Sequence, residues 1–284
     1  MAARIKDEEL LLSAAQAALL AGEEIMAVYD TDFSVDFKAD ESPLTLADTR
    51  SHDLITKQLE ATGIPILSEE GRDIPFEQRS GWQRLWIVDP LDGTKEFVKR
   101  RGEFTVNIAL VEKGKPRMGI IYVPVKKTLY FGKRGTGSYK LTDETALTDL
   151  RRAAPRRLDA ALLGDISAKG RKLPSRQGRP DALAIVGSRS HGGEALREYV
   201  ETKRREAGNV DFVSAGSSLK FCLVAEGTAD IYPRLGPTME WDTAAGQAIA
   251  ENSGAVVLAY DTGKPLTYNR ENLLNPWFIV KRQQ

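Results

Sequence analysis

Apolar side chains recur every three or four residues near the start of the chain, and this spacing predicts an amphipathic helix over about residues 7 to 30. Its apolar positions are Leu10, Leu11, Ala14, Ala17, Ala18, Ala21, Ile25 and Val28. A second helix is predicted over about 45 to 61, with Leu46, Ile55 and Leu59 on one face and Asp48 near its start. We expect the first helix to cover a sheet.

Short apolar runs bounded by Gly, Pro or charged residues predict strands in the first half of the chain. They lie at 33–37, 64–68, 85–88, 104–112, 117–122 and 127–132. Short turns separate the last three of these runs, so the first half is expected to be α+β with an antiparallel sheet.

In the second half, strand-like runs alternate with helix-like runs, which is typical of an α/β arrangement. Strands are predicted at 181–187, 211–213, 229–233, 255–258 and 278–281, and helices at 193–202, 218–226 and 243–252. This change of pattern predicts two subdomains, 1–134 and 135–284.

One segment, 151–179, carries nine basic and two acidic residues, with Gly and Pro interspersed and little periodicity. We interpret it as a solvated surface loop. A role in attracting an anionic substrate is the alternative.

The chain has 284 residues, and its 40 basic residues balance its 40 acidic ones. Proteins that coat nucleic acid need an excess of basic residues on an extended face, so this balance argues against a polymer partner and leaves a local anion pocket open. Cys222 is the single cysteine, which excludes a disulfide framework and fits a reducing compartment. No secretory signal is recognised, and the apolar stretches fall short of the ~20 residues of a membrane span. A cytoplasmic protein is expected, with loose association at the inner face of the membrane left open.

Acidic residues follow two of the predicted strands. Glu69 and Glu70 come directly after one strand, and Asp89 and Asp92 come after another, on either side of a Pro-Leu pair. Ligands in layered α/β structures bind at the carboxyl ends of strands, and convergent carboxylates suit Mg²⁺. Each piece alone also has an ordinary interpretation: a type I turn, a solvated acidic pair and, for Asp242, a helix cap.

These residues belong to a longer pattern that resembles the inositol monophosphatase superfamily of Mg²⁺-dependent, lithium-sensitive phosphatases. The shared motifs are Glu69-Glu70, the run from Trp86 to Thr94 (W-x-x-D-P-x-D-G-T) and Trp241-Asp242 before a helix of small residues. The next residues, Lys95-Glu96-Phe97, resemble the 3'(2'),5'-bisphosphate nucleotidase branch. The resemblance extends from about residue 8 to 280, is weakest at about 135 to 182, and implies a layered αβαβα sandwich.

The resemblance also implies a metal site for two or three Mg²⁺ ions. Its ligands would be the carboxylates of Glu69, Asp89, Asp92 and Asp242 and the backbone carbonyl of Leu91. Glu70 is the less expected ligand of its pair, because the first Glu is the one that binds in this superfamily.

The implied catalytic residues are Glu69, Thr94 and Asp48, which would activate and orient a water. Backbone N–H groups around Gly93 and Thr94 would hold phosphate oxygens. Local capping is the alternative for Asp48 and Thr94, since Asp48 lies near a helix start and Thr94 at a turn.

Substrate-binding residues are implied in the second half. In the nucleotidase branch, positions matching His191, Ser217, Lys220 and Arg234 contact the nucleotide and its second phosphate, and Asp242 lies beside it. A cation at Arg234 favours an additional phosphate over sugar hydroxyls. A solvated loop for His191 and a helix-surface charge for Lys220 are the alternatives.

These observations predict removal of the 3'-phosphate from adenosine 3',5'-bisphosphate, or from its sulfated analogue, in sulfur assimilation. One alternative is an inositol or sugar phosphate monoesterase of the same superfamily. Another is a non-catalytic, metal-dependent protein that binds nucleotides or inositol phosphates. Monomer and homodimer both remain open.

Overall fold

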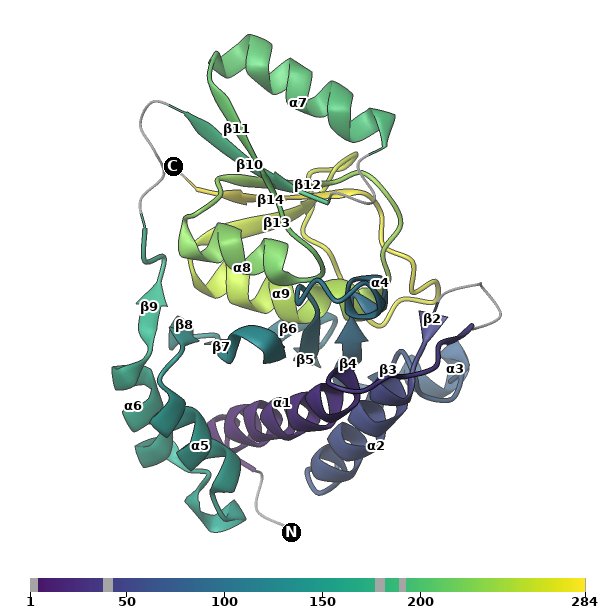
Figure 1. The fold of residues 1–284 in the computed structure, drawn as a ribbon, viewed down its shortest axis with the longest axis vertical. Helices are drawn as coiled ribbons and strands as arrows, with labels where there is room; N and C mark the ends of the chain where they lie inside the picture. The colour runs from purple at the N-terminus through teal and green to yellow at the C-terminus, as the bar shows by residue number, and fades with distance from the viewer. Residues whose placement is uncertain (1–4, 38–42, 177–181, 189–192, 284) are drawn as a thin grey trace.

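The computed structural model describes residues 5–37, 43–176, 182–188 and 193–283. Its helices and sheets stack in five layers (Figure 1). Helices α1 (Asp7–Tyr29) and α2 (Leu46–Glu60) cover one face of a seven-stranded sheet, and α8 (Leu219–Glu226) and α9 (Glu240–Asn252) cover the other. A five-stranded sheet and then α7 (Glu194–Ala207) complete the stack. The predicted layered αβαβα sandwich is confirmed.

The first sheet has the order β3-β4-β5-β6-β7-β8-β9, and only β3 and β4 are parallel. Its strands are Ile66–Ser68, Arg84–Asp92, Thr105–Glu112, Lys115–Val123, Thr128–Lys133, Gly137–Leu141 and Arg171–Leu173. The pairing of β4 with β5 shifts register between Asp89 and Asp92, so a bulge separates these two acidic residues. This sheet continues past residue 134, and the division into 1–134 and 135–284 stays a proposal.

The second sheet has the order β11-β10-β12-β14-β13. In chain order, β10 to β14 are Leu183–Gly187, Val210–Ser214, Ile231–Arg234, Ala255–Ala259 and Phe278–Arg282. Strand β10 is parallel to both neighbours, whereas β14 is antiparallel to β12 and β13. The mixture agrees with the predicted α/β character of the second half.

Smaller elements connect the layers. They are β1 (Asp36–Phe37), β2 (Pro43–Leu44), α3 (Phe76–Arg79), α4 (Thr94–Val98), η1 (Pro124–Lys126), α5 (Glu144–Arg152), η2 (Pro155–Arg157) and α6 (Ala160–Lys169). Helix α4 begins directly after β4, so it carries the end of the acidic motif.

Helix α9 lies at the centre of the molecule, between the two sheets (Figure 1). Small side chains allow this close packing. A Cβ atom on Gly119 of β6 would lie 2.3 Å from the backbone oxygen of Ala245, and one on Gly246 would lie 2.4 Å from Cγ of Phe221 in α8. The small-residue run of α9 is therefore required where it meets β6 and α8.

Helix α1 is long and apolar enough to cross a membrane by length and composition alone, which the sequence interpretation did not recognise. In the fold it is a core helix, because 67% of its apolar window is buried. The predicted apolar face is confirmed by Leu10, Leu11 and Ile25, each at most 1% exposed.

Two expectations are wrong. The 151–179 segment is not simply a solvated loop, because it contains η2, α6 and β9 in its described part. Asp159 caps α6, whose own Leu162 and Ile166 side chains are buried, and β9 pairs with β8. The surrounding basic residues hide this short apolar pattern. Leu46 is 52% exposed rather than buried, because it is the first residue of α2.

Candidate active site

Three carboxylates converge where β3, β4 and α9 meet. One carboxylate oxygen from each of Glu69, Asp89 and Asp242 lies within 4.8 Å of the others. Glu69 directly follows β3, Asp89 lies near the end of β4, and Asp242 lies in the first turn of α9. Residues far apart in the sequence thus form one acidic cluster, which we call the carboxylate trio.

Burial and mutual repulsion favour the protonated forms within this trio. The pKa of Asp89 is raised well above its usual range by burial and by the charges of Glu69 and Asp92. The pKa of Asp242 is raised to about 8 by burial and by the charges of Asp92 and Glu69. Oxygen ligands in this arrangement are suited to a hard divalent cation, which would stabilise the charged forms.

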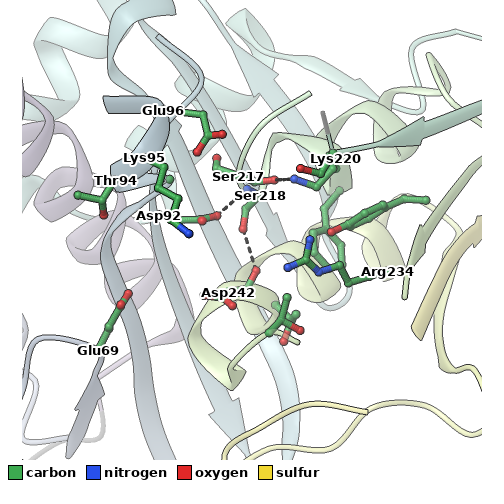
Figure 2. Close-up of a pocket in the computed structure, with 16 residues that line it drawn as sticks. Glu69, Asp92, Thr94, Lys95, Glu96, Ser217, Ser218, Lys220, Arg234 and Asp242 are labelled. Atoms are coloured by element: carbon green, nitrogen blue, oxygen red, sulfur yellow. Dashed lines mark hydrogen bonds between the residues drawn. The ribbon is translucent and has the colours of Figure 1, made fainter. Parts of the chain in front are cut away.

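Asp92 lies next to the trio without being part of it. In the described part of the chain, its Oδ2 accepts hydrogen bonds from the backbone N–H of Ser218 at 2.6 Å and from Nδ2 of Asn107 at 3.3 Å. Figure 2 shows Asp92 between Thr94 and Ser218, facing the same space as Asp242. Its charge acts on both Asp89 and Asp242, so the sequence motif does bring the fourth carboxylate to this site.

Asp48 serves the helix and the site at once. Its Oδ2 accepts from the backbone N–H and the hydroxyl of Thr45 at 2.8 and 2.6 Å. The bond from the backbone N–H is one half of a capping box at the start of α2, and the Thr45 side chain accepts the other half from a backbone N–H of the helix. Its Oδ1 accepts from Oγ1 of Thr94 at 3.2 Å. The capping and functional interpretations are therefore compatible for this residue.

The turn after Asp92 depends on Gly93, whose φ of 91° lies in the left-handed region that favours glycine. Thr94 begins α4, and its hydroxyl lies 3.2 Å from the backbone oxygen of Leu91. Leu91 in turn donates its N–H to Oδ1 of Asp89 at 3.1 Å. The turn thus holds the Leu91 carbonyl, Thr94 and both aspartates in one compact unit.

Across the cavity lies the segment 215–220, in which a loop runs into the first two residues of α8; we call it the 215–220 loop. Ser217 has a φ of 44°, unusual for a residue other than glycine. Nζ of Lys220 donates to the backbone oxygen of Ser217 at 2.6 Å. Burial lowers the pKa of Lys220 to about 8, although the nearby charge of Asp92 favours its charged form.

Arg234 ends β12 and lines the same cavity of about 190 Å³ as Asp92, Lys220 and Asp242. Its Nη2 donates to the backbone oxygen of Pro237 at 2.7 Å. Its Nε is buried and has no hydrogen-bond partner among the described residues. In Figure 2 its guanidinium faces this space from the side opposite Asp92. His191, also predicted to bind substrate, lies outside the described residues.

Several supporting residues escaped sequence analysis. Oγ of Ser51 in α2 donates to the backbone oxygen of Pro90 at 2.7 Å, and Nδ1 of His52 lies 2.9 Å from Oγ of Ser68, which precedes Glu69. Asn107 and Ser218 contact Asp92, as described above. Two signals were present: polar residues at helical spacing after Asp48, and Asn107 as an isolated amide within an apolar strand.

Comparisons with known proteins show relatives that match nearly the whole chain. The profile described as the inositol monophosphatase family matches residues 6–277. A protein of Salmonella typhimurium named 3'(2'),5'-bisphosphate nucleotidase CysQ is 44% identical over 277 residues, which cover 95% of this chain and 99% of that protein. The protein of the same name from Escherichia coli K12 is 45% identical, covering 93% and 96%.

Among solved structures, CysQ from Bacteroides thetaiotaomicron superimposes with a TM-score of 0.87 at 47% identity, covering 98% of each chain. It is described as a bacterial member of the inositol monophosphatase family. The five-layer fold, the acidic motifs and these whole-length similarities lead to one conclusion: this chain belongs to the inositol monophosphatase family.

Proposed function

We propose that this protein is a Mg²⁺-dependent phosphatase that removes the 3'-phosphate from adenosine 3',5'-bisphosphate to give AMP and phosphate, in sulfur assimilation. The observation that carries the proposal is a single cavity with carboxylates on one side and Lys220 and Arg234 on the other. One phosphate can lie at the acidic side with its cations while the other pairs with the basic side. Relatives of 44–46% identity that bear the nucleotidase name support this substrate.

The donor set fits Mg²⁺. Three carboxylate oxygens lie within 4.8 Å of one another, Asp92 lies beside them, and one of the trio, Asp89, is only 1% exposed. Glu69, Asp89, Asp92, Asp242 and the Leu91 carbonyl would hold two or three ions. When bound, these ions would lower the pKa of a water and stabilise the leaving oxygen.

The side chains around the turn then have distinct roles. The hydroxyl of Thr94 lies 3.2 Å from both Oδ1 of Asp48 and the backbone oxygen of Leu91, and both of these atoms can only accept its proton. The hydroxyl oxygen of Thr94 is therefore left to accept a hydrogen bond from the attacking water. Glu69, on the other side, would take a proton from that water. Backbone N–H groups of Gly93 and Thr94 would hold the equatorial phosphate oxygens, where charge resides in the transition state.

The phosphate that is not cleaved would pair with Arg234 and Lys220, with Ser217 and His191 completing the contacts. Arg234 offers a buried N–H that has no protein acceptor among the described residues. A substrate with two phosphates would supply that acceptor. A monoester of inositol carries one phosphate and would leave this side of the cavity without a partner.

A substrate panel tests the proposal. Phosphate release at saturating Mg²⁺ is compared for adenosine 3',5'-bisphosphate, its sulfated analogue, inositol 1-phosphate and fructose 1,6-bisphosphate. We expect the adenosine bisphosphate to have the highest kcat/KM. Preference for inositol 1-phosphate or the sugar would indicate the monoesterase alternative, and binding without release of phosphate would indicate a regulatory protein.

We further propose a cytoplasmic protein acting on a small molecule, as either a monomer or a homodimer. The buried thiol of Cys222 and the absence of any other cysteine in the sequence support a reducing compartment. Association with the inner face of the membrane stays an untested expectation.

A further inference from the structure

Asn107 lies in the middle of β5, opposite Asp89 in the register of the sheet, and is 1% exposed. Its Nδ2 donates to Oδ2 of Asp92 at 3.3 Å and to Oγ of Ser218 at 2.9 Å. Its Oδ1 accepts from the hydroxyl of Thr105 at 2.9 Å. Both ends of the buried amide are therefore used. Asp92 and the hydroxyl oxygen of Ser218 act as acceptors, so the NH2 end of the amide faces them, and Thr105 gives its proton to Oδ1.

This proton also fixes the next hydrogen bond. The hydroxyls of Thr105 and Ser217 lie 3.0 Å apart. Because Thr105 gives its single proton to Asn107, Ser217 must donate to Thr105. A chain of hydrogen bonds therefore runs from Ser217 through Thr105 and Asn107 to Asp92.

Ser218 joins this chain to the other half of the acidic site. Its backbone N–H donates to Asp92 at 2.6 Å, and its hydroxyl donates to the backbone oxygen of Asp242 at 2.8 Å (Figure 2). The same hydroxyl accepts from Asn107. One serine thus contacts Asp92 and Asp242, which come from different layers of the fold, and Asn107 holds that serine in place.

We propose that Asn107 is a positioning residue that couples cation binding at Asp92 and Asp242 to the ordering of the 215–220 loop. Both hydrogen bonds that Asp92 accepts in the described part of the chain end on Oδ2, which leaves Oδ1 for a cation. A cation that binds Asp92 also restricts Ser218 through the hydrogen bond between them. In the same way, an anion that orders the 215–220 loop restricts Asp92. Linkage makes this effect equal in both directions.

The proposal rests on the proposed function only where it assigns Ser217 and Lys220 to the substrate. The coupling itself is measured without turnover. Mg²⁺ binding is followed by calorimetry and by the Mg²⁺-dependent rise in Tm, with and without inorganic phosphate. Release of phosphate from adenosine 3',5'-bisphosphate is followed separately.

Asn107→Leu keeps the approximate side-chain volume and removes every hydrogen bond of the amide. We expect its Kd for Mg²⁺ to rise about 10-fold or more, as is typical when a group orienting a metal ligand is lost. Inorganic phosphate should tighten Mg²⁺ binding to the wild type, and that gain should largely disappear in the variant. Thr105→Val removes only the hydrogen bond to Oδ1 of Asn107. It should change the Mg²⁺ Kd and the effect of phosphate in the same direction as Asn107→Leu, by a smaller amount.

Thr128→Val is the matched control, because it removes a hydrogen bond made by a buried side chain of the same sheet, from Thr128 to the backbone oxygen of Lys126, away from α8 and α9. It should lower Tm and leave the Mg²⁺ Kd unchanged. If Asn107→Leu and Thr105→Val behave like this control, Asn107 is only a packing residue and the proposal fails. If Asn107→Leu does not fold, Thr105→Val and Ser218→Ala decide the matter by the same two quantities. A wild type that binds Mg²⁺ but releases no phosphate from the bisphosphate would overturn the proposed function and leave the coupling result standing.

Discussion

At the scale of single residues, the polar groups of this site also stabilise the fold. Asp242 accepts from the backbone N–H of Met239 at 2.8 Å at the start of α9, and Asp92 accepts from Ser218 at the start of α8. Asp48 caps α2 in the same way. Each carboxylate thus caps the start of a helix with one oxygen and directs the other oxygen toward the cavity or the adjacent turn. An Asp→Asn substitution therefore removes the charge and keeps the shape of the side chain.

Asp92→Asn should largely abolish turnover while leaving the fold intact. The amide oxygen can still accept from Ser218, but a negative charge is lost from the cation site. In the presence of EDTA, Tm should stay equal or rise, because repulsion with Asp89 and Asp242 is relieved. Phosphate release and melting with and without Mg²⁺ test this, with Glu70→Gln as the control. Retention of more than about a tenth of the activity, a barrier change under ~1.4 kcal/mol, would remove Asp92 from the site.

Arg234→Ala should lower kcat/KM for adenosine 3',5'-bisphosphate. The corresponding rise in activation free energy should be about 2–4 kcal/mol, the cost of losing a charge-assisted pair in a partly dry site. Adenosine 3'-phosphate lacks the second phosphate, so its slower turnover should change far less. Steady-state kinetics of both proteins on both substrates measure the difference. Equal losses on the two substrates would mean that Arg234 supports the 234–237 turn through its bond to Pro237.

At the scale of elements, the contact between β6 and α9 determines where Asp242 lies. Gly119→Ala places a methyl group 2.3 Å from the backbone oxygen of Ala245, which cannot rotate away. We expect a loss of stability of about 1–3 kcal/mol or more, together with weaker Mg²⁺ binding, because α9 must move. Gly164→Ala in α6 is the control: nothing lies within 4 Å of the added atom, and this change should stabilise by about 0.5–1 kcal/mol. Chemical denaturation of both variants decides the comparison, and equal stabilities would show that α9 adjusts without cost.

Segments with a clear apolar pattern were predictable from sequence, including the short strands β11 to β14, whereas segments with few apolar positions among charged neighbours were not. Helices α1 and α2 and strands β5 and β6 lie within a few residues of their predicted ranges, because their apolar spacing continues for at least two turns or pairs. Helix α5 has only three buried positions, Ala146, Leu147 and Leu150, among charged neighbours, and β8 and β9 become strands only by pairing with each other and β7. Tertiary contacts determine such elements.

The same distinction applies to the site. The acidic residues were identified because each lies in a short sequence motif that resembles the family's pattern, although the motifs themselves lie far apart in the chain. Asn107 and Ser218 contact each other across 111 positions of the chain, and Asn107 lies outside every recognised motif. Their roles follow from the pairing of β4 with β5 and from the position of α8, which sequence periodicity does not specify.

At the scale of the whole molecule, the carboxylate cluster makes stability depend on pH and Mg²⁺ together. The folded-state pKa values of Asp89 and Asp242 lie above the usual 3.8. A raised carboxyl pKa means that the folded state binds more protons than the unfolded state. Proton binding therefore stabilises the fold at low pH, and this stabilisation is lost as pH rises. With EDTA, Tm should therefore fall between about pH 4 and about pH 8, the pKa of Asp242.

Saturating Mg²⁺ should remove most of this decline, because a bound cation favours the charged carboxylates. Melting curves from pH 5 to 8 with EDTA and with Mg²⁺ test the expectation, and Asp242→Asn should flatten the EDTA curve. Parallel curves with and without Mg²⁺ would contradict it, because the cation would then bind elsewhere.

The carboxylates are divided between the β3–β4 region and α9, and this division affects the nascent chain during synthesis. During synthesis, Glu69, Asp89 and Asp92 leave the ribosome about 150 to 173 residues before Asp242. The nascent chain therefore carries the first three carboxylates before α9, which supplies Asp242, has been made. Full-strength cation binding therefore requires α9 to dock between the two sheets. Metal binding thus indicates that synthesis has passed residue 242, and we expect a protein truncated before this residue to lack the metal and to be open to proteolysis.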